Sequence, residues 1–122
     1  RKMVPKNISL QSAVKQWGNI AALTYGLSSN NREIISRSMV DSIVEPVRSK
    51  LIPEYDNIKK SAISHGAIGC SISGSGPSIF SLCKNEIEAK EVLRSMEDIL
   101  ETNSIHFHSY ISPINNDGIK IV

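Results

Sequence analysis

The sequence predicts an α+β fold in which helices cover one face of an antiparallel sheet. Three observations lead to this class. Apolar residues recur at helical spacing in the first half of the chain, two strand-like runs then flank a glycine-rich turn, and a further helix and strand-like run follow. Strands joined by a tight turn pair antiparallel, and a sheet of this kind needs helices on one face to bury its apolar side.

Three helices are expected before the sheet. The first is an amphipathic helix that follows Ser9, a favourable N-cap, and its apolar positions are Leu10, Ala13, Val14, Trp17, Ile20 and Ala21. A second helix is expected over residues 32–42, and a third starts with Pro53 in its first turn and runs through Ile63. Residues 47–52, which lie between two prolines, are expected to form a short turn of helix or a bend.

The second half of the chain predicts the sheet. Residues 67–73 and 78–83 alternate as two strands around the turn. Asn85 then provides an N-cap, with Glu88 as its capping-box partner, for a helix with a regular apolar stripe. Residues 105–111 alternate as a further strand, and a final edge strand is expected at 119–122.

The composition is that of an ordinary globular domain. Of the 122 residues, 40% are apolar and 21% are charged, which argues against disorder. The net charge of +2 is too small to indicate a nucleic-acid partner. No apolar run approaches the roughly 18 residues of a membrane span, so a membrane partner is not expected either. Because the chain starts with Arg1, we expect residues 1–122 to be one domain cut from a longer protein.

The glycine-rich segment is the strongest candidate for a site. Ser73, Gly74, Ser75 and Gly76 gather backbone N–H groups and small side chains, and such a loop can attract an anion or let a ligand approach closely. The segment is neither a Walker loop nor a dinucleotide-binding fingerprint. A plain hairpin turn explains the same composition, and spacing alone does not separate the two interpretations.

Two arginines are candidates for binding an acidic group. Arg48 lies near Glu45 between two prolines, and its guanidinium can hold a carboxylate in two-point contact. Arg1 is a candidate of the same kind. The alternative for Arg48 is an ordinary surface or salt-bridged arginine.

Histidines and cysteines indicate neither catalysis nor metal binding. His106 and His108 alternate on one expected strand, but a third ligand at useful spacing is missing. Cys70 and Cys83 are not spaced as a metal knuckle or a disulfide framework. We expect buried free thiols in a reducing, cytoplasmic compartment, no metal site, and no carboxylate pair placed for acid–base catalysis.

Residues 66–83 closely resemble the third conserved motif of the homoserine kinases, a family within the GHMP superfamily of small-molecule kinases. Residues 44–53 resemble that family's Glu-Pro-x-Arg-x-x-Leu-x-Pro segment, and residues 1–6 resemble its Arg-x-x-Leu-Pro segment. The resemblance therefore covers nearly the whole chain in the right order. The chain departs from the pattern at Glu54, where the family usually has Gly, and at Met3-Val4, where Leu-Leu is common.

The resemblance implies a ferredoxin-like sandwich that forms the C-terminal domain of a kinase. The parent enzyme would transfer the γ-phosphoryl group of ATP to the hydroxyl of L-homoserine, giving O-phospho-L-homoserine in threonine biosynthesis. By matching position, Arg48 would bind the homoserine carboxylate with help from Arg1, and the backbone of residues 73–76 would wall the pocket. The family's nucleotide loop is absent from this sequence. ATP and Mg²⁺ are therefore expected to bind mainly to an N-terminal domain, and the chain alone is expected to be inactive.

Two alternatives remain at this point. In the first, the chain is not part of a homoserine kinase but a stand-alone ferredoxin-like regulatory module that senses a small amino acid. In the second, it is part of another GHMP kinase with a different alcohol substrate. The Glu-Pro-x-Arg segment argues against the second. The partners implied by the resemblance are L-homoserine and the enzyme's own N-terminal domain. Apolar surface that once met that domain would favour a homodimer.

Overall fold

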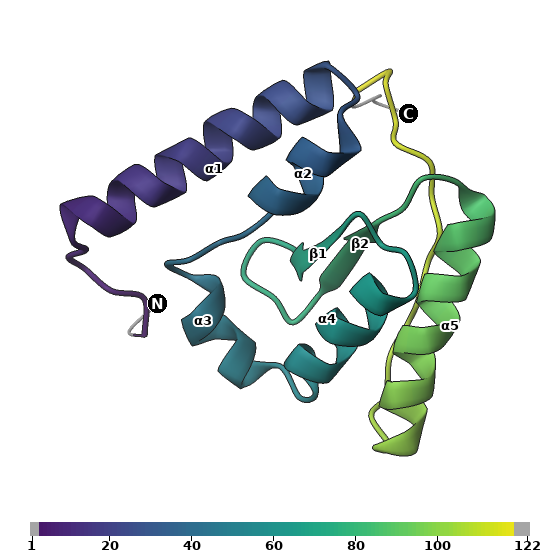
Figure 1. Ribbon diagram of the computed structural model, residues 1–122. Coiled ribbons are helices and arrows are strands. Elements are labelled where there is room, and N and C mark those ends of the chain that lie inside the picture. The colour runs from purple at the N-terminus through teal and green to yellow at the C-terminus, as the bar shows by residue number, and fades with distance from the viewer. Residues whose placement is uncertain (1–2, 119–122) are drawn as a thin grey trace.

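The computed structural model of the protein describes residues 3–118 (Figure 1). The elements in chain order are α1 (Leu10–Ser28), α2 (Arg32–Ser38), α3 (Glu45–Arg48), the 3₁₀ turn η1 (Ser49–Leu51), α4 (Tyr55–Ser64), β1 (Gly69–Ile72), β2 (Ile79–Leu82) and α5 (Glu86–Thr102). Within the described residues the sheet consists of β1 and β2, which pair antiparallel. The predicted α+β class is therefore confirmed.

One face of the sheet is covered by α4 and α5, and the other is partly covered: Gly69 lies against Met39, and the Ser71 hydroxyl donates to Glu45. Cys70 and Ile79 point to the covered face, where they pack against α4 and α5 in a core cluster that includes Ala62 and Val92. Phe80 alternates to the other face and remains 45% exposed. This alternation follows from the two-residue period of a strand, so the sequence pattern predicted it correctly.

The predicted helix N-caps at Ser9 and Asn85 are confirmed. The Ser9 hydroxyl accepts a hydrogen bond from the Ser12 amide at 3.1 Å, and the Asn85 side chain accepts one from the Glu88 amide at 2.9 Å. Two boundaries differ from expectation. α2 ends at Ser38 rather than near residue 42, and α4 begins after Pro53 rather than including it.

The expected apolar stripe of α1 does not enter the core of the described chain. Leu10, Val14 and Trp17 are all more than half exposed. The buried positions of α1 are the small residues Ala13 and Gly26, and a Cβ on Gly26 would lie 3.0 Å from Ile35 on α2, so a larger side chain does not fit there. α1 is therefore the predicted helix, but it approaches α2 closely at Gly26 and leaves much of its apolar stripe exposed.

The segment 105–111 is a correction to the expected strand. It is not part of the sheet, and it runs beside α5 in the opposite direction (Figure 1). The reversal is local: Ser104 has a φ of 54°, and the Ile105 amide donates to the Leu100 carbonyl at 2.9 Å. The Ser109 hydroxyl then donates to the Glu97 carboxylate on α5. The edge strand expected at 119–122 lies outside the described residues.

Glu54, where the chain departs from the kinase pattern, has an unusual backbone conformation. It is the N-cap of α4 and has a φ of 59° and a ψ of 13°, which is the left-handed region. Residues with a Cβ are disfavoured there by about 1–2 kcal/mol, whereas glycine is not. The Glu54 carboxylate accepts a hydrogen bond from the Asn57 side chain at 2.5 Å, which offsets part of this cost.

Candidate functional site

The glycine-rich loop, residues 73–78, connects β1 to β2 as a closed turn. The Ser73 amide donates to the Ser78 carbonyl at 2.8 Å, and the Gly76 amide donates to the Ser73 carbonyl at 3.0 Å. Gly74 and Gly76 have φ values of 58° and 75°, which only glycine adopts without strain. Two of the loop's amides are thus used by the turn itself, as in the hairpin-turn interpretation, and fewer amides are left for the alternative, an anion-binding nest.

The two glycines differ in their surroundings. A Cβ on Gly76 would lie 3.1 Å from Cδ1 of Ile52 and 3.3 Å from Cγ2 of Ile72, whereas a Cβ on Gly74 would meet nothing within 4 Å. The loop therefore packs on the rest of the domain at Gly76 and is open at Gly74. A ligand would approach the open end.

Arg48 reaches this loop from α3. Its Nη1 donates a hydrogen bond to the carbonyl of Ser75 at 2.6 Å, across 27 positions of sequence. A guanidinium has five N–H groups. Because this is its one recorded hydrogen bond among the described residues, further N–H groups remain to meet a ligand. The structure thus brings together two of the segments that the sequence singled out.

Glu45 supports the same region, and sequence analysis had treated it only as a neighbour of Arg48. Its Oε1 forms an ion pair with Lys59 on α4, and its Oε2 accepts a hydrogen bond from the Ser71 hydroxyl on β1 at 3.1 Å. The signal that could have found it is the i, i+3 spacing of Glu45 and Arg48, which places both on one side of a helical turn. Burial, and then the negative charge of Glu45, raise the pKa of the neighbouring Tyr55 hydroxyl, which stays protonated.

The remaining candidate residues lie elsewhere. Arg1 is outside the described residues. Cys70 and Cys83 are free, and burial raises the pKa of both thiols, so neither is an activated nucleophile. His106 and His108 lie on the segment beside α5. In residues 3–118 no three His, Cys, Asp or Glu side chains form a group that could hold a metal ion.

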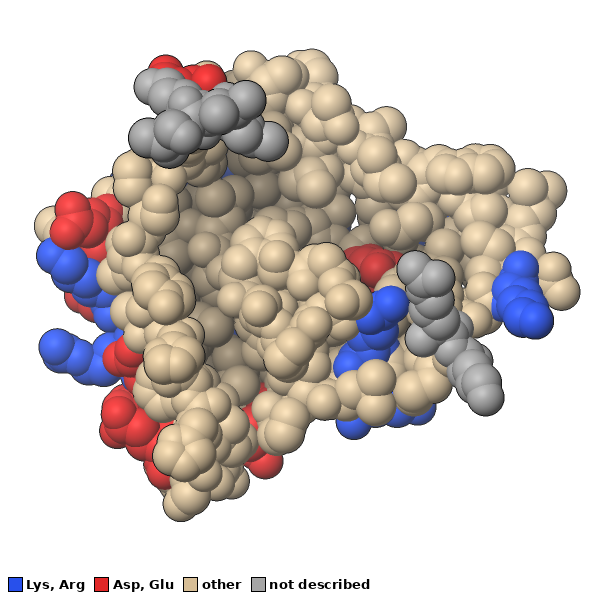
Figure 2. Space-filling model, turned by 180° about the vertical axis from the view of Figure 1, so that it is seen from behind, with Lys and Arg blue, Asp and Glu red and all other residues tan. Residues whose placement is uncertain are grey.

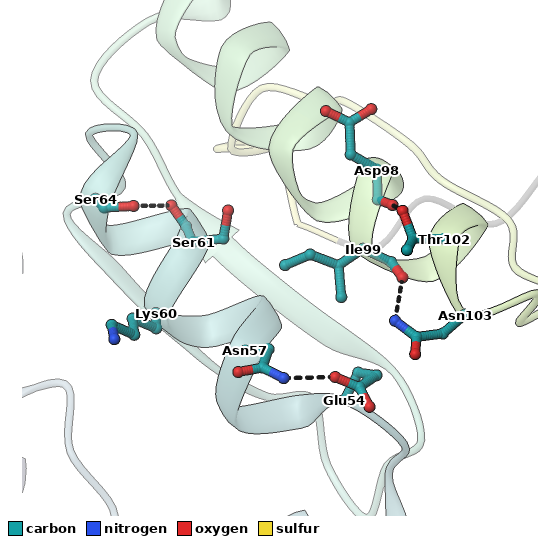
Figure 3. A pocket seen from close by; sticks show the side chains of 9 residues that line it. All are labelled: Glu54, Asn57, Lys60, Ser61, Ser64, Asp98, Ile99, Thr102 and Asn103. Atoms are coloured by element: carbon teal, nitrogen blue, oxygen red, sulfur yellow. Dashed lines mark hydrogen bonds between the residues drawn. The ribbon is translucent and has the colours of Figure 1, made fainter.

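A separate open groove lies between α4 and α5, with a volume of about 530 Å³ (Figure 3). Its side chains mostly bond to their own helices: Thr102 donates to the Asp98 carbonyl at 2.6 Å, and Asn103 donates to the Ile99 carbonyl at 2.8 Å. None of the site residues expected from sequence lines it. The groove is therefore the seam between two helices and not part of the candidate site.

The charged side chains of the described residues do not gather into one patch on the face drawn in Figure 2. The face turned away from the viewer of Figure 1 is largely uncharged, with charged side chains along its left edge, at its right end and in one small acidic and basic group right of the centre (Figure 2). This face carries no continuous basic patch of the kind that binds nucleic acid. Among the described residues, no helix combines the length and the apolar character needed to cross a bilayer.

Comparison with known proteins identifies the class. Residues 20–101 match the family described as GHMP kinases C terminal, so the chain belongs to this family. The match covers both Arg48 and the glycine-rich loop.

Homoserine kinases from several organisms are similar to this chain. The homoserine kinase of Chlorobium phaeobacteroides strain BS1 is 43% identical over 124 residues, covering 100% of this chain and 39% of that protein. The homoserine kinase of Thermoplasma volcanium is 35% identical over 122 residues, with the same coverage. The crystal structure of homoserine kinase from Cytophaga hutchinsonii is 48% identical and superposes with a TM-score of 0.85, covering 87% of this chain and 34% of that one. The chain thus spans about two fifths of the length of the curated relatives that it matches.

Proposed function

We propose that residues 1–122 form the C-terminal, substrate-side domain of a homoserine kinase. The parent enzyme transfers the γ-phosphoryl group of ATP to the hydroxyl of L-homoserine and releases O-phospho-L-homoserine, a step of threonine biosynthesis. The full coverage of this chain by homoserine kinases, at 35–43% identity, supports the proposal. So does the similarity in structure to the Cytophaga enzyme.

The observation that carries the role of this domain is the contact between Arg48 and the glycine-rich loop. At 2.6 Å from the Ser75 carbonyl, the guanidinium lies at the loop while further N–H groups are left for a ligand. Homoserine carries a carboxylate, and a planar guanidinium is suited to bind it through two parallel hydrogen bonds. Arg48 therefore binds the substrate carboxylate, and Arg1 contributes a second contact to the same group.

The glycine-rich loop shapes the same pocket. Ser73, Gly74, Ser75 and Gly76 present backbone rather than bulky side chains, so a small amino acid can lie against them. Phosphoryl transfer depends mainly on orientation and on neutralisation of charge. This domain contributes orientation: Arg48 fixes one end of the substrate, and the loop limits where the hydroxyl end can lie.

The nucleotide belongs to another part of the enzyme in this proposal. The described residues contain no cluster that fits a metal ion, and the sequence lacks the kinase nucleotide loop, so ATP and Mg²⁺ bind mainly to an N-terminal domain. The exposed apolar side chains of α1 leave a surface for that domain or for a second copy in a homodimer. We place the enzyme in the cytoplasm, where its two free cysteines stay reduced.

Replacement of Arg48 in the full-length parent tests the role of this domain. Charge-assisted hydrogen bonds contribute about 1.5–3 kcal/mol, so R48A should raise the KM for L-homoserine roughly tenfold or more and leave the KM for ATP nearly unchanged. Arg94, which is exposed on α5, provides the matched control, and R94A should change neither KM. An unchanged KM for homoserine in R48A would remove Arg48 from the site.

A further inference from the structure

The carboxylate of Glu45 joins three elements of the fold. One oxygen pairs with the ammonium of Lys59 on α4, and the other accepts from the hydroxyl of Ser71 on β1 at 3.1 Å. The Glu45 side chain is only 13% exposed. Lys59 is itself positioned, because its Nζ lies 5.9 Å from the centre of the Tyr55 ring. Both oxygens of Glu45 are thus used by fixed partners in a largely buried setting.

The helix that carries Glu45 is short and depends on contacts with neighbouring elements for its position. α3 is four residues long and has no buried residue. A helix of this length is not stable by its own hydrogen bonds, because the free-energy cost of nucleating a helix exceeds the stabilisation that one turn of hydrogen bonds provides. Its position must therefore come from side-chain contacts to neighbouring elements. The contacts of Glu45 with α4 and β1 are the ones that tie its first residue to the core.

The last residue of the same helix is Arg48. Positions i and i+3 lie on one side of a helical turn, so Glu45 and Arg48 project toward the same part of the domain. The first is tied to Ser71 at the end of β1, and the second reaches Ser75 in the loop that follows β1. Any rotation or shift of α3 that followed the loss of the Glu45 contacts would move the guanidinium away from the loop.

We propose that Glu45, with Lys59 and Ser71, is a positioning residue that sets the place of the Arg48 guanidinium for the substrate carboxylate. This inference rests on the proposed function and adds a residue that positions Arg48. Glu45 does not touch the substrate. It acts through α3, and its contribution exists only while Arg48 is present.

The test is a double-mutant cycle in the full-length parent, with steady-state kinetics for both substrates. E45Q keeps the size of the side chain and removes the charge that pairs with Lys59. We expect the KM for L-homoserine to rise roughly fivefold, the effect of weakening one charge-assisted contact, with kcat and the KM for ATP nearly unchanged. In the R48A background, E45Q should add nothing further, because residues that act through one group are not additive.

Two further variants separate positioning from stability. S71A removes the hydroxyl partner without changing a charge, so it serves if E45Q does not fold, and it should raise the same KM to a smaller extent. E86Q breaks the Glu86–Lys90 ion pair on α5, which has the same chemistry but is 65–71% exposed. It should leave both KM values unchanged, because exposed pairs contribute little.

Three results would overturn the inference: an unchanged KM for homoserine in both E45Q and S71A, an equal rise with and without Arg48, or a loss of kcat and of affinity for both substrates in proportion to a loss of folded protein. In each of these cases the wild-type parent still phosphorylates homoserine, so the proposed function stands. A wild-type parent that does not phosphorylate homoserine would overturn both.

Discussion

Residue 54 offers a sharp test of the backbone geometry at the start of α4. Glu54 is held at a φ of 59°, and its side chain accepts a hydrogen bond from Asn57. In E54G the left-handed conformation no longer opposes a Cβ, which gains about 1 kcal/mol. Loss of the exposed hydrogen bond costs about 0.5 kcal/mol, so the net expectation is a gain of about 0.5 kcal/mol in the free energy of unfolding.

The variant E54A separates the two contributions. It loses the same carboxylate but keeps a Cβ, so it should be less stable than the wild type by about 0.5 kcal/mol and less stable than E54G by about 1 kcal/mol. In a domain of this size that difference corresponds to roughly 4 °C in Tm. Urea unfolding and thermal unfolding, followed by circular dichroism on the 122-residue chain, would measure it. An alanine variant as stable as the glycine variant would refute a left-handed residue 54.

Three further predictions concern the loop and the core. G76A should lower the free energy of unfolding by about 1 kcal/mol more than G74A, because both strain a left-handed residue but only Gly76 also meets packed side chains; equal losses in urea unfolding would contradict this packing. Y55F should leave Tm unchanged or raise it, because the buried hydroxyl forms no well-aligned hydrogen bond with the nearby Glu45 and Ser71 side chains. A clear fall in Tm would show that one of these contacts stabilises the fold. Iodoacetamide should modify half-buried Cys83 before buried Cys70, and both labelling rates should rise as the pH approaches the raised thiol pKa values. Mass spectrometry would measure the two rates, and faster labelling of Cys70 would contradict its burial.

Features that depend on neighbouring residues were predictable from the sequence. The caps at Ser9 and Asn85 are such cases, because a side chain satisfies an amide only three positions away. The two-stranded hairpin is another, since alternation on both sides of a glycine-rich turn defines both the strands and their pairing. Arg48 and the loop were also named from sequence, although their contact was not.

Features that depend on distant partners were not predictable. The alternation at 105–111 indicates a chain with two faces but does not supply a strand to pair with, and here the chain reverses at Ser104 and follows α5. The stripe on α1 shows which residues are apolar without showing what covers them. The contacts of Glu45 span 14 and 26 positions of sequence, so no local pattern could specify them.

We have proposed that this domain holds the substrate for a homoserine kinase. The most direct measurement is ADP release by the full-length parent with ATP, Mg²⁺ and L-homoserine, with the 122-residue chain assayed beside it. We expect the parent to turn over homoserine and the chain alone to be inactive. A parent that releases ADP with another alcohol and not with homoserine would contradict the substrate assignment, and turnover by the isolated chain would contradict the division of the site between two domains.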